Sequence, residues 1–299
     1  MIQTALSFAD LAGWADDDHR AALDVFLQTC AAVPGDWTDP GTDPRGFFES
    51  RFRPVMMTDG TPMLFTGYFE PELPGALQRG GRFQHPIYAP PPDLIPDGPW
   101  LSRRQIEETD ALAGLEILWL ASAVERFFLQ VQGSGRIALP DGQTLRVGFA
   151  AKNGHPYASI GAELIRRGEL TPERASAQAL RDWIAAHPEQ EQALLWTNPS
   201  YAFFRKINTI PATDGPIGSL GESITPLRSI AVDPAFTPLG LPVWIEMDND
   251  LHRLMIAQDT GSAIRGAQRA DIFYGTGDAA GDLAGRTKAT GRMITLIPK

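Results

Sequence analysis

The 299-residue sequence has one cysteine, Cys30, which excludes an intrachain disulfide and any metal site built from several cysteines. Its five histidines do not indicate a zinc enzyme, because no two have metal-ligand spacing and the HExxH pattern is absent. We therefore expect no bound metal. No hydrophobic run approaches the roughly 20 residues that a membrane-spanning helix requires.

Positive charge is also scarce. The chain has 26 lysines and arginines against 36 acidic residues, so its formal net charge is −10. Without a local basic patch, we expect no nucleic-acid partner. The first basic residue is Arg20, and Cys30 lies in an apolar helical pattern. The sequence as given therefore predicts neither a signal peptide nor a lipobox cysteine.

The composition that remains is that of a globular protein, with 43% hydrophobic and 21% charged residues. The length fits two domains, or one large β-rich domain. Apolar spacing predicts helices at 17–34 and 46–52, and another at 171–188 with Thr171 as its N-cap. The segment 115–135 is compatible with a helix or a strand. From residue 198 onward, short strands separated by glycine- and proline-rich turns indicate a barrel or sandwich.

The segment GSGRIA (133–138) matches a dinucleotide-binding fingerprint, but that motif must open a helix. Here Pro140, Asp141 and Gly142 follow at once and predict the turn of a hairpin over residues 135–150. We expect a two-residue turn with positive φ at both Asp141 and Gly142. The dinucleotide site is therefore rejected.

Two aspartates, Asp259 and Asp271, lie in the glycine-rich segment AQDTGSAIRGAQRADIFYGTG (257–277). This segment and four others occur in the order found in the membrane-bound lytic murein transglycosylase A family, which the sequence resembles from about Thr66 to its C-terminus. The other four are TGYFEPEL (66–73), FFLQVQGSGRI (127–137), NPSYAFF (198–204) and TPLRSIAVDPAFTPLGLPVWIE (225–246).

The resemblance implies a mainly β fold with some helices. A double-psi β-barrel domain, formed by residues 1–71 and 206–299, would carry the catalytic site. A second β-rich domain, residues 72–205, would be inserted into it, with a substrate groove between the two.

The resemblance also implies a reaction, cleavage of the β-1,4 bond between N-acetylmuramic acid and N-acetylglucosamine in peptidoglycan. The product would be a 1,6-anhydromuramic end, and neither a metal nor a cofactor would be required. The catalytic residue would be Asp271. The residues expected to contact the glycan strand are Thr66, Gly67, Tyr68, Gln132, Gly133, Ser134, Asp259, Gly261 and Ser262.

A single carboxyl suffices for such a reaction because the C6 hydroxyl of the muramic sugar attacks its own anomeric carbon. Intramolecular attack carries effective molarities of about 10⁵ M or more, so positioning replaces a second catalytic group. Asp271 must start protonated, which burial favours. The apolar residues 272–274 predict such burial, whereas Thr260, Gly261 and Ser262 are expected to hydrogen-bond Asp259 and keep it ionised.

Two other functions remain open. An inverting glycoside hydrolase on a related barrel would need a second carboxylate across the groove, and Asp233 and Glu70 are candidates. A non-catalytic glycan-binding module would tolerate the loss of Asp271.

The resemblance further implies a periplasmic or outer-membrane location. Cell-wall synthesis or division proteins are possible partners, but the sequence identifies none.

Overall fold

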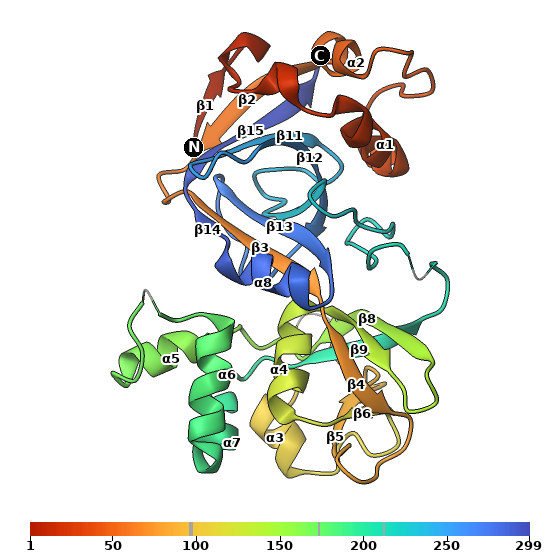
Figure 1. Cartoon of the computed structure of the whole chain (residues 1–299), viewed down its shortest axis with the longest axis vertical. Coiled ribbons are helices and arrows are strands. Elements are labelled where there is room, and N and C mark those ends of the chain that lie inside the picture. The colour runs from red at the N-terminus through yellow and green to blue at the C-terminus, as the bar shows by residue number, and fades with distance from the viewer. Residues whose placement is uncertain (96–97, 173, 212) are drawn as a thin grey trace. The chain divides into compact units, whose positions relative to one another are not determined.

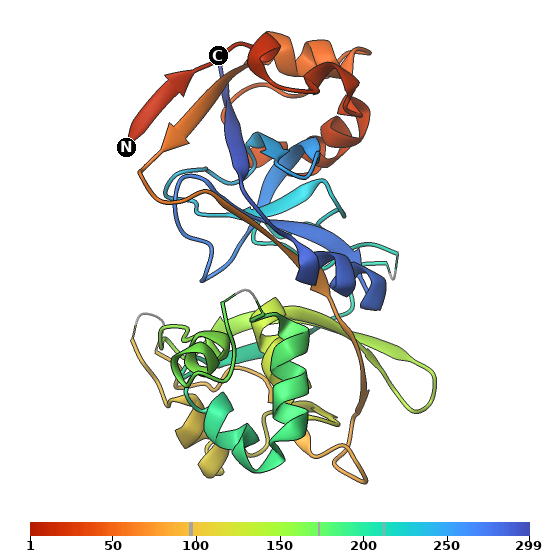
Figure 2. The same ribbon diagram turned by 60° about the vertical axis from the view of Figure 1, so that its left-hand side comes forward.

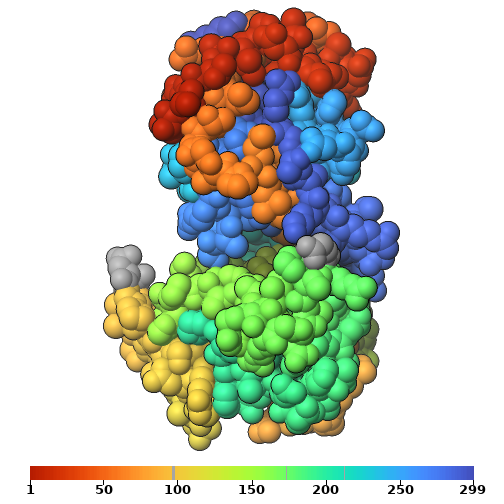
Figure 3. Space-filling view, turned by 90° about the vertical axis from the view of Figure 1, so that its left-hand side faces the viewer, coloured from red at the N-terminus to blue at the C-terminus, as the bar shows by residue number. Residues whose placement is uncertain are grey.

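The computed structural model describes residues 1–95, 98–172, 174–211 and 213–299, which divide into two compact units (Figure 1). The barrel unit comprises Met1–Phe69 and Pro211–Lys299, and the insert unit comprises Glu70–Ile210. Figure 3 shows that the N-terminal segment, in red and orange, and the C-terminal segment, in blue, lie side by side on the surface of the barrel unit. The insertion predicted at residues 72–205 lies within the insert unit, and the roles assigned to the two domains stay predictions.

The barrel unit is built on a nine-stranded sheet in the order β1-β2-β15-β11-β12-β10-β13-β3-β14. Its strands are β1 (Ile2–Ala5), β2 (Phe52–Thr58), β3 (Leu64–Glu70), β10 (Ser229–Val232), β11 (Pro242–Met247), β12 (His252–Thr260), β13 (Arg269–Thr276), β14 (Lys288–Ala289) and β15 (Gly291–Pro298). Its helices are α1 (His19–Thr29), α2 (Pro44–Arg51) and α8 (Asp278–Arg286).

The two largest apolar cores of the barrel unit involve α1 and the central strands. In the first, α1 buries Phe26 against sheet residues that include Trp244 and Ile256. This helix begins where the Asp18 side chain accepts a hydrogen bond from the backbone of Ala21, which satisfies one of the free N–H groups of the first turn. The second core is formed by alternate residues of the central strands, and α8 packs on β13 (Figure 2).

The insert unit is built on a six-stranded sheet in the order β5-β6-β4-β7-β8-β9. The strands are β4 (Glu72–Ala76), β5 (His85–Tyr88), β6 (Glu116–Leu120), β7 (Ser134–Ala138), β8 (Thr144–Lys152) and β9 (Ala202–Ile207). The helices are α3 (Arg103–Glu108), α4 (Ala123–Gln132), α5 (Ile160–Arg166), α6 (Ala177–Ala186) and α7 (Glu191–Leu195). Across the described residues, no helix combines the length and apolarity needed to cross a membrane.

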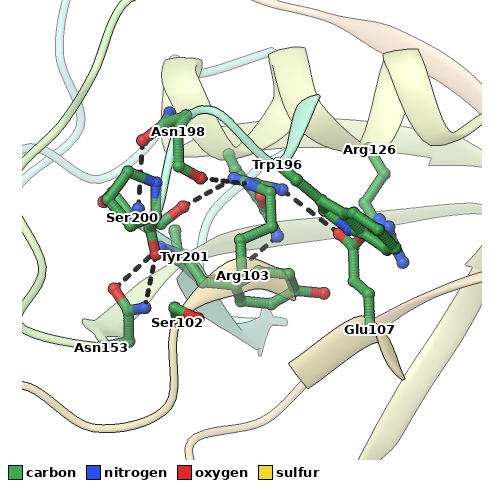
Figure 4. A network of polar contacts seen from close by, with 12 residues as sticks. Ser102, Arg103, Glu107, Arg126, Asn153, Trp196, Asn198, Ser200 and Tyr201 are labelled. Atoms are coloured by element: carbon green, nitrogen blue, oxygen red, sulfur yellow. Dashed lines mark hydrogen bonds and ion pairs between the residues drawn. The ribbon is translucent and has the colours of Figure 1, made fainter. Parts of the chain in front are cut away.

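A buried polar network joins α3 to α4 and to the segment before β9 (Figure 4). Glu107 accepts hydrogen bonds from Arg126 Nη2 at 2.6 Å and Trp196 Nε1 at 2.9 Å. Arg103, only 2% exposed, donates to the backbone carbonyls of Asn198 and Ser200. The carboxylate lies between two guanidinium groups, and this shared charge stabilises the buried arginines.

The ambiguous segment 115–135 contains both structures in succession, because β6 is followed by α4, which the Ser122 side chain caps. Gly133 ends α4 in the left-handed region at φ 81°, which glycine adopts without strain. A strand and not a helix follows it, so the GSGRIA segment lacks the structure of a dinucleotide site.

The predicted hairpin is present as β7 and β8, but its predicted turn is wrong. Gly142 alone of the two central residues has positive φ, at 83°. The Gly142 N–H bonds to the carbonyl of Leu139, with Pro140 at the position that its fixed φ favours. The connection is therefore a proline-initiated turn followed by a left-handed glycine.

The helix predicted at 171–188 is shorter than expected, and Thr171 is not its cap. It begins at Ala177, where the Ser176 side chain accepts a hydrogen bond from the backbone of Ala179. The Arg174 N–H bonds to the carbonyl of Thr171 in a separate turn. Residue 173 lies outside the described residues. Cys30 also lies beyond α1, as its C-cap, and is partly buried.

Candidate active site

The register of the central strands aligns the two aspartates that the sequence singled out. Ala231 of β10 pairs with Asp259 of the parallel strand β12 and with Asp271 of the antiparallel strand β13. A β-bulge between Ile230 and Ala231 sets this register. Since neighbouring strands lie about 4.8 Å apart, the two backbones are separated by roughly 10 Å. The two aspartates thus lie level with each other on the strands that flank β10, with the small residue Ala231 between them.

Asp271 is partly buried and is hydrogen-bonded to β3. Thr66 Oγ1 donates to Asp271 Oδ1 at 2.5 Å. Burial raises the pKa of Asp271 above its ordinary value, and the Asp259 charge raises it further, while Thr66 and Arg269 act in the opposite direction. Among the described residues, the hydrogen bond from Thr66 is the one that Asp271 receives, so Oδ2 is available to hold a proton.

Asp259 is hydrogen-bonded far more fully. Its Oδ1 accepts from Ser219 N at 3.1 Å, Ser219 Oγ at 2.9 Å and Thr260 N at 2.9 Å. Its Oδ2 accepts from Tyr68 Oη at 2.9 Å. Burial, followed by the Asp259 charge, raises the pKa of Tyr68 well above its ordinary value, so this phenol keeps its proton and remains a donor. These four bonds nearly fill the acceptor capacity of a carboxylate.

The pKa of Asp271 is shifted upward as predicted, but the direction of the shift does not distinguish the two aspartates. Burial raises the pKa of Asp259 as well, although its hydrogen bonds to Thr260, Ser219 and Tyr68 oppose the effect. The two groups differ in the number of donors they face. Hydrogen bonds to a carboxylate favour its charged form, whereas a carboxyl with one donor has an oxygen free for proton transfer.

Side chains of β3 divide between two faces, as alternation in a strand requires. Thr66 and Tyr68 contact the two aspartates. Gly67 points to the opposite face, where an added Cβ would lie 2.7 Å from Ala284 Cα of α8 and 2.7 Å from the Tyr274 ring. Gly67 therefore allows close packing between β3, β13 and α8.

Two of the expected wall residues lie in the turn after β12. The Ile264 N–H bonds to the carbonyl of Gly261 at 3.0 Å, and Ser262 is exposed. The serine hydroxyl that contacts Asp259 comes instead from Ser219, about 40 residues earlier in the chain. Ser219 lies in a loop without a recognisable pattern, so the sequence alone does not single it out.

The remaining predicted contacts, Gln132, Gly133 and Ser134, belong to the insert unit. Gln132 is the last residue of α4, Gly133 is its C-cap, and Ser134 opens β7. The three follow one another where a helix turns into a strand, and their contact with glycan stays a prediction.

The candidate second acids of an inverting hydrolase have other partners. Asp233 accepts hydrogen bonds from Gly266 N at 3.0 Å and Ala235 N at 3.2 Å, which fixes the chain just after β10. Glu70 is fully buried and forms ion pairs with Arg136 and Arg146, each at 2.9 Å. Both carboxylates thus stabilise local structure.

A cavity of about 630 Å³ lies within the insert unit and is lined mainly by polar residues, including His85, Glu107, Arg126 and Glu191. None of the predicted site residues lines it. Arg126 and Glu107 also belong to the network of Figure 4, which provides a structural reason for their presence.

Comparisons with known proteins identify the class of both units. Residues 64–205 match the family description "MltA specific insert domain" and residues 228–297 match the "3D domain". A crystal structure of a membrane-bound lytic murein transglycosylase from Agrobacterium tumefaciens is 32% identical, with a TM-score of 0.88. The match covers 100% of this chain and 98% of that one.

Two further relatives are from Escherichia coli. Membrane-bound lytic murein transglycosylase A of strain K12 is 40% identical over 248 residues, which are 78% of this chain and 65% of the relative. The chain thus matches slightly less than two thirds of that protein. The structure of E. coli MltA with bound chitohexaose is 29% identical, with a TM-score of 0.75, and covers 100% of this chain and 95% of that one.

The chain therefore belongs to the membrane-bound lytic murein transglycosylase A family, which confirms the predicted resemblance. The predicted fold class is also confirmed, namely a mainly β protein in which a double-psi β-barrel domain carries an inserted β-rich domain. The parallel pairing of β10 with β12 in a largely antiparallel sheet is the crossover that distinguishes this barrel from a simple meander.

Proposed function

We propose that the protein is a peptidoglycan lytic transglycosylase in which Asp271 is the single catalytic acid and base. The observation that carries this proposal is the environment of the Asp271 carboxyl. It is partly buried, has a raised pKa, and receives one hydrogen bond on Oδ1, so Oδ2 is free to carry the transferred proton.

The reaction begins with Asp271 protonated. It gives its proton to the oxygen of the β-1,4 bond between N-acetylmuramic acid and N-acetylglucosamine, and the bond from that oxygen to the anomeric carbon breaks. The C6 hydroxyl of the muramic sugar then bonds to the anomeric carbon and returns its proton to Asp271. No water is consumed, and the product is a 1,6-anhydromuramic end.

Asp259 serves a different purpose in this proposal. Four donors hold its negative charge beside Asp271, where it raises the pKa of the acid and stabilises the positive charge that develops on the sugar ring. Its saturated oxygens leave little capacity to activate a water, which favours transglycosylation over inverting hydrolysis.

The substrate is a glycan strand. The E. coli relative with bound chitohexaose supports this choice, because that ligand is a β-1,4-linked oligosaccharide of N-acetylglucosamine. Thr66, Tyr68 and Asp259 would border the reacting sugars, and the Gly261–Ser262 turn would shape the wall. Gly67 would support this wall from the opposite face of β3, where it allows close packing on α8. Gln132, Gly133 and Ser134 would bind the strand from the insert domain. The proposed location is the periplasm or the outer membrane, and the words "membrane-bound" in the name of the E. coli relative support a membrane association.

Digestion of purified peptidoglycan by the protein and by Asp271→Asn tests the reaction. We expect muropeptides about one water (~18 Da) lighter than hydrolytic products, and a loss of at least 10²-fold in their release by the variant. Mass spectrometry of the released fragments measures both.

Reducing ends of normal mass would contradict transglycosylation and indicate a hydrolase. Glycan binding by both proteins without release of fragments would indicate a binding module instead. Asp278→Asn, an exposed substitution in the first turn of α8, provides a control of equal charge change and should release fragments at the rate of the parent protein.

A further inference from the structure

Arg269 lies two residues before Asp271 on β13, so the two side chains project from the same face of the strand. Arg269 Nη2 donates to Thr66 Oγ1 at 2.9 Å, and Thr66 Oγ1 donates to Asp271 Oδ1 at 2.5 Å. The three side chains therefore form one continuous chain of hydrogen bonds that ends on the candidate catalytic carboxyl.

The guanidinium is itself fixed by the backbone. Arg269 Nη1 donates to the carbonyl of Ala270 at 2.6 Å and to that of Leu64 at 3.3 Å. Leu64 opens β3, and its N–H bonds to the carbonyl of Gln268, just before β13. The arginine is thus held where the two strands begin, and its remaining Nη2 group faces the Thr66 hydroxyl.

We propose that Arg269 is a positioning residue for the reaction, which sets the direction of the Thr66 hydroxyl and thereby the oxygen of Asp271 that carries the proton. This inference rests on the function proposed above. Arg269 contacts Thr66 and not the reacting atoms, so it acts through the hydroxyl.

The physical reason lies in the hydrogen-bonding capacities of the three groups. A guanidinium only donates, whereas a hydroxyl has one proton and two lone pairs. When Arg269 occupies a lone pair of Thr66 Oγ1, the hydroxyl becomes a better donor and a poorer acceptor. Its proton is then directed to Asp271 Oδ1, and the acidic proton is kept on Oδ2, where a sugar oxygen can receive it.

The charge of Arg269 has the opposite effect on acidity. It lowers the pKa of Asp271, so removal of the charge should raise that pKa and increase the protonated fraction near neutral pH. If acidity alone mattered, the loss of Arg269 would not slow the reaction. If positioning matters, activity falls even though more of the acid is protonated.

The test compares Arg269→Met, Arg269→Gln and Arg269→Lys on purified peptidoglycan across a range of pH. For Arg269→Met we expect kcat to fall about 10–100-fold with a small change in KM, since catalysis is sensitive to misplacement of about 1 Å. The alkaline limb of the pH–rate profile should move to higher pH. Arg269→Gln restores a hydrogen-bond donor without charge, so it should recover part of kcat while the alkaline limb stays at the higher pH. Arg269→Lys restores the positive charge, so it should return the alkaline limb towards its original pH.

A double-mutant cycle shows whether the effect passes through the hydroxyl. Once Thr66→Val has removed that hydroxyl, the additional change Arg269→Met should alter kcat less than twofold. Arg292→Gln is the matched control, because Arg292 pairs with Glu246 in the same unit and has no bond to Thr66 or Asp271. Its kcat and pH limb should remain those of the parent protein.

Three results would overturn the proposal. The first is full additivity of the effects of Thr66→Val and Arg269→Met on kcat. The second is an equal loss of kcat in all three Arg269 variants that follows a loss of thermal stability. The third is an effect of Arg269→Met on kcat no larger than that of Arg292→Gln.

NMR titration of ¹³C-labelled aspartate carboxyls separates this proposal from the function itself. If the parent protein releases no fragments, the proposed function fails. The titration tests the coupling between Arg269 and Asp271 independently of activity. If Asp271 titrates identically in the parent protein and in Arg269→Met, this coupling is refuted.

Discussion

At the scale of single residues, the number of donors around a carboxyl distinguishes the two aspartates better than the surrounding hydrophobicity does. Burial raises the pKa of both Asp259 and Asp271. Four hydrogen bonds to Asp259 oppose this effect of burial, whereas Asp271 has one hydrogen bond, from Thr66. An acid that must release and recover a proton needs an oxygen that no other group occupies.

The raised pKa of Asp271 predicts a cost in stability. Between the unfolded and folded pKa values the native state binds more protons than the unfolded chain, so stability falls as pH rises through this window. At pH 7, above the unfolded-state pKa of aspartate, the folded protein therefore bears the cost of this upward shift. Asp271→Asn should raise the unfolding midpoint by about 2–4 °C at pH 7, which corresponds to about 1 kcal/mol in a chain of this size.

Calorimetry at pH 7 and near pH 3 measures this effect. The difference should disappear at the lower pH, where the aspartate is protonated in both states. Asp282→Asn, an exposed change in α8, should shift the midpoint by less than about 1 °C. A lower midpoint for Asp271→Asn at pH 7 would mean that the charge stabilises the fold.

At the scale of elements, the site depends on how closely β3 approaches α8. Thr66 and Tyr68 reach the aspartates because the opposite face of β3 packs tightly, with no side chain at Gly67. The family resemblance associates Gly67 with the substrate, and the structure adds a packing reason for the glycine. Such a reason cannot be seen along the chain, because α8 is more than 200 residues away.

Gly67→Ala should destabilise the barrel unit by about 1–3 kcal/mol, because its Cβ would overlap the α8 backbone and the Tyr274 ring. Chemical denaturation measures the change. Gly285→Ala is the matched control: it lies in α8 with open space around its Cβ position, and alanine favours helices, so a gain of about 0.5–1 kcal/mol is expected. Equal stability of Gly67→Ala and the parent protein would show that α8 moves aside.

At the scale of the whole molecule, the two units have separate cores. Apolar clusters of the barrel unit involve α1 and the central strands, whereas those of the insert unit lie around its own sheet and helices. The insert unit also contains the buried network centred on Glu107 (Figure 4). We therefore expect local damage to one core to be felt mainly in that unit.

Glu107→Ala should cost about 3–5 kcal/mol, because it leaves the Arg103 and Arg126 guanidinium groups buried without their shared carboxylate. Hydrogen exchange should increase in α3, α4 and β9 and change little in β10 and β13. Glu108, the next residue in the chain, forms an exposed ion pair with Arg104. Glu108→Ala should therefore cost less than about 1 kcal/mol. Equal exchange changes in both units would contradict their independence.

The sequence alone predicted much of this protein. Alternating apolar residues in the C-terminal third predicted short strands, and the five ordered segments predicted the family and the fold class. These features are local in the chain, or depend on order along it, so no tertiary information was required. The sequence misplaced the start of α6 and the turn at Asp141, since serine and threonine are both good caps and several turn types accept Asp-Gly.

Only the tertiary structure decided how the site is assembled. Ser219 reaches Asp259 from a loop and Thr66 reaches Asp271 from a neighbouring strand, and their separations from these aspartates along the chain carry no periodic signal. The sequence named the two carboxyl groups because their segment is distinctive. Their donors depend on which strands lie side by side, and that arrangement is set by packing across the whole sheet.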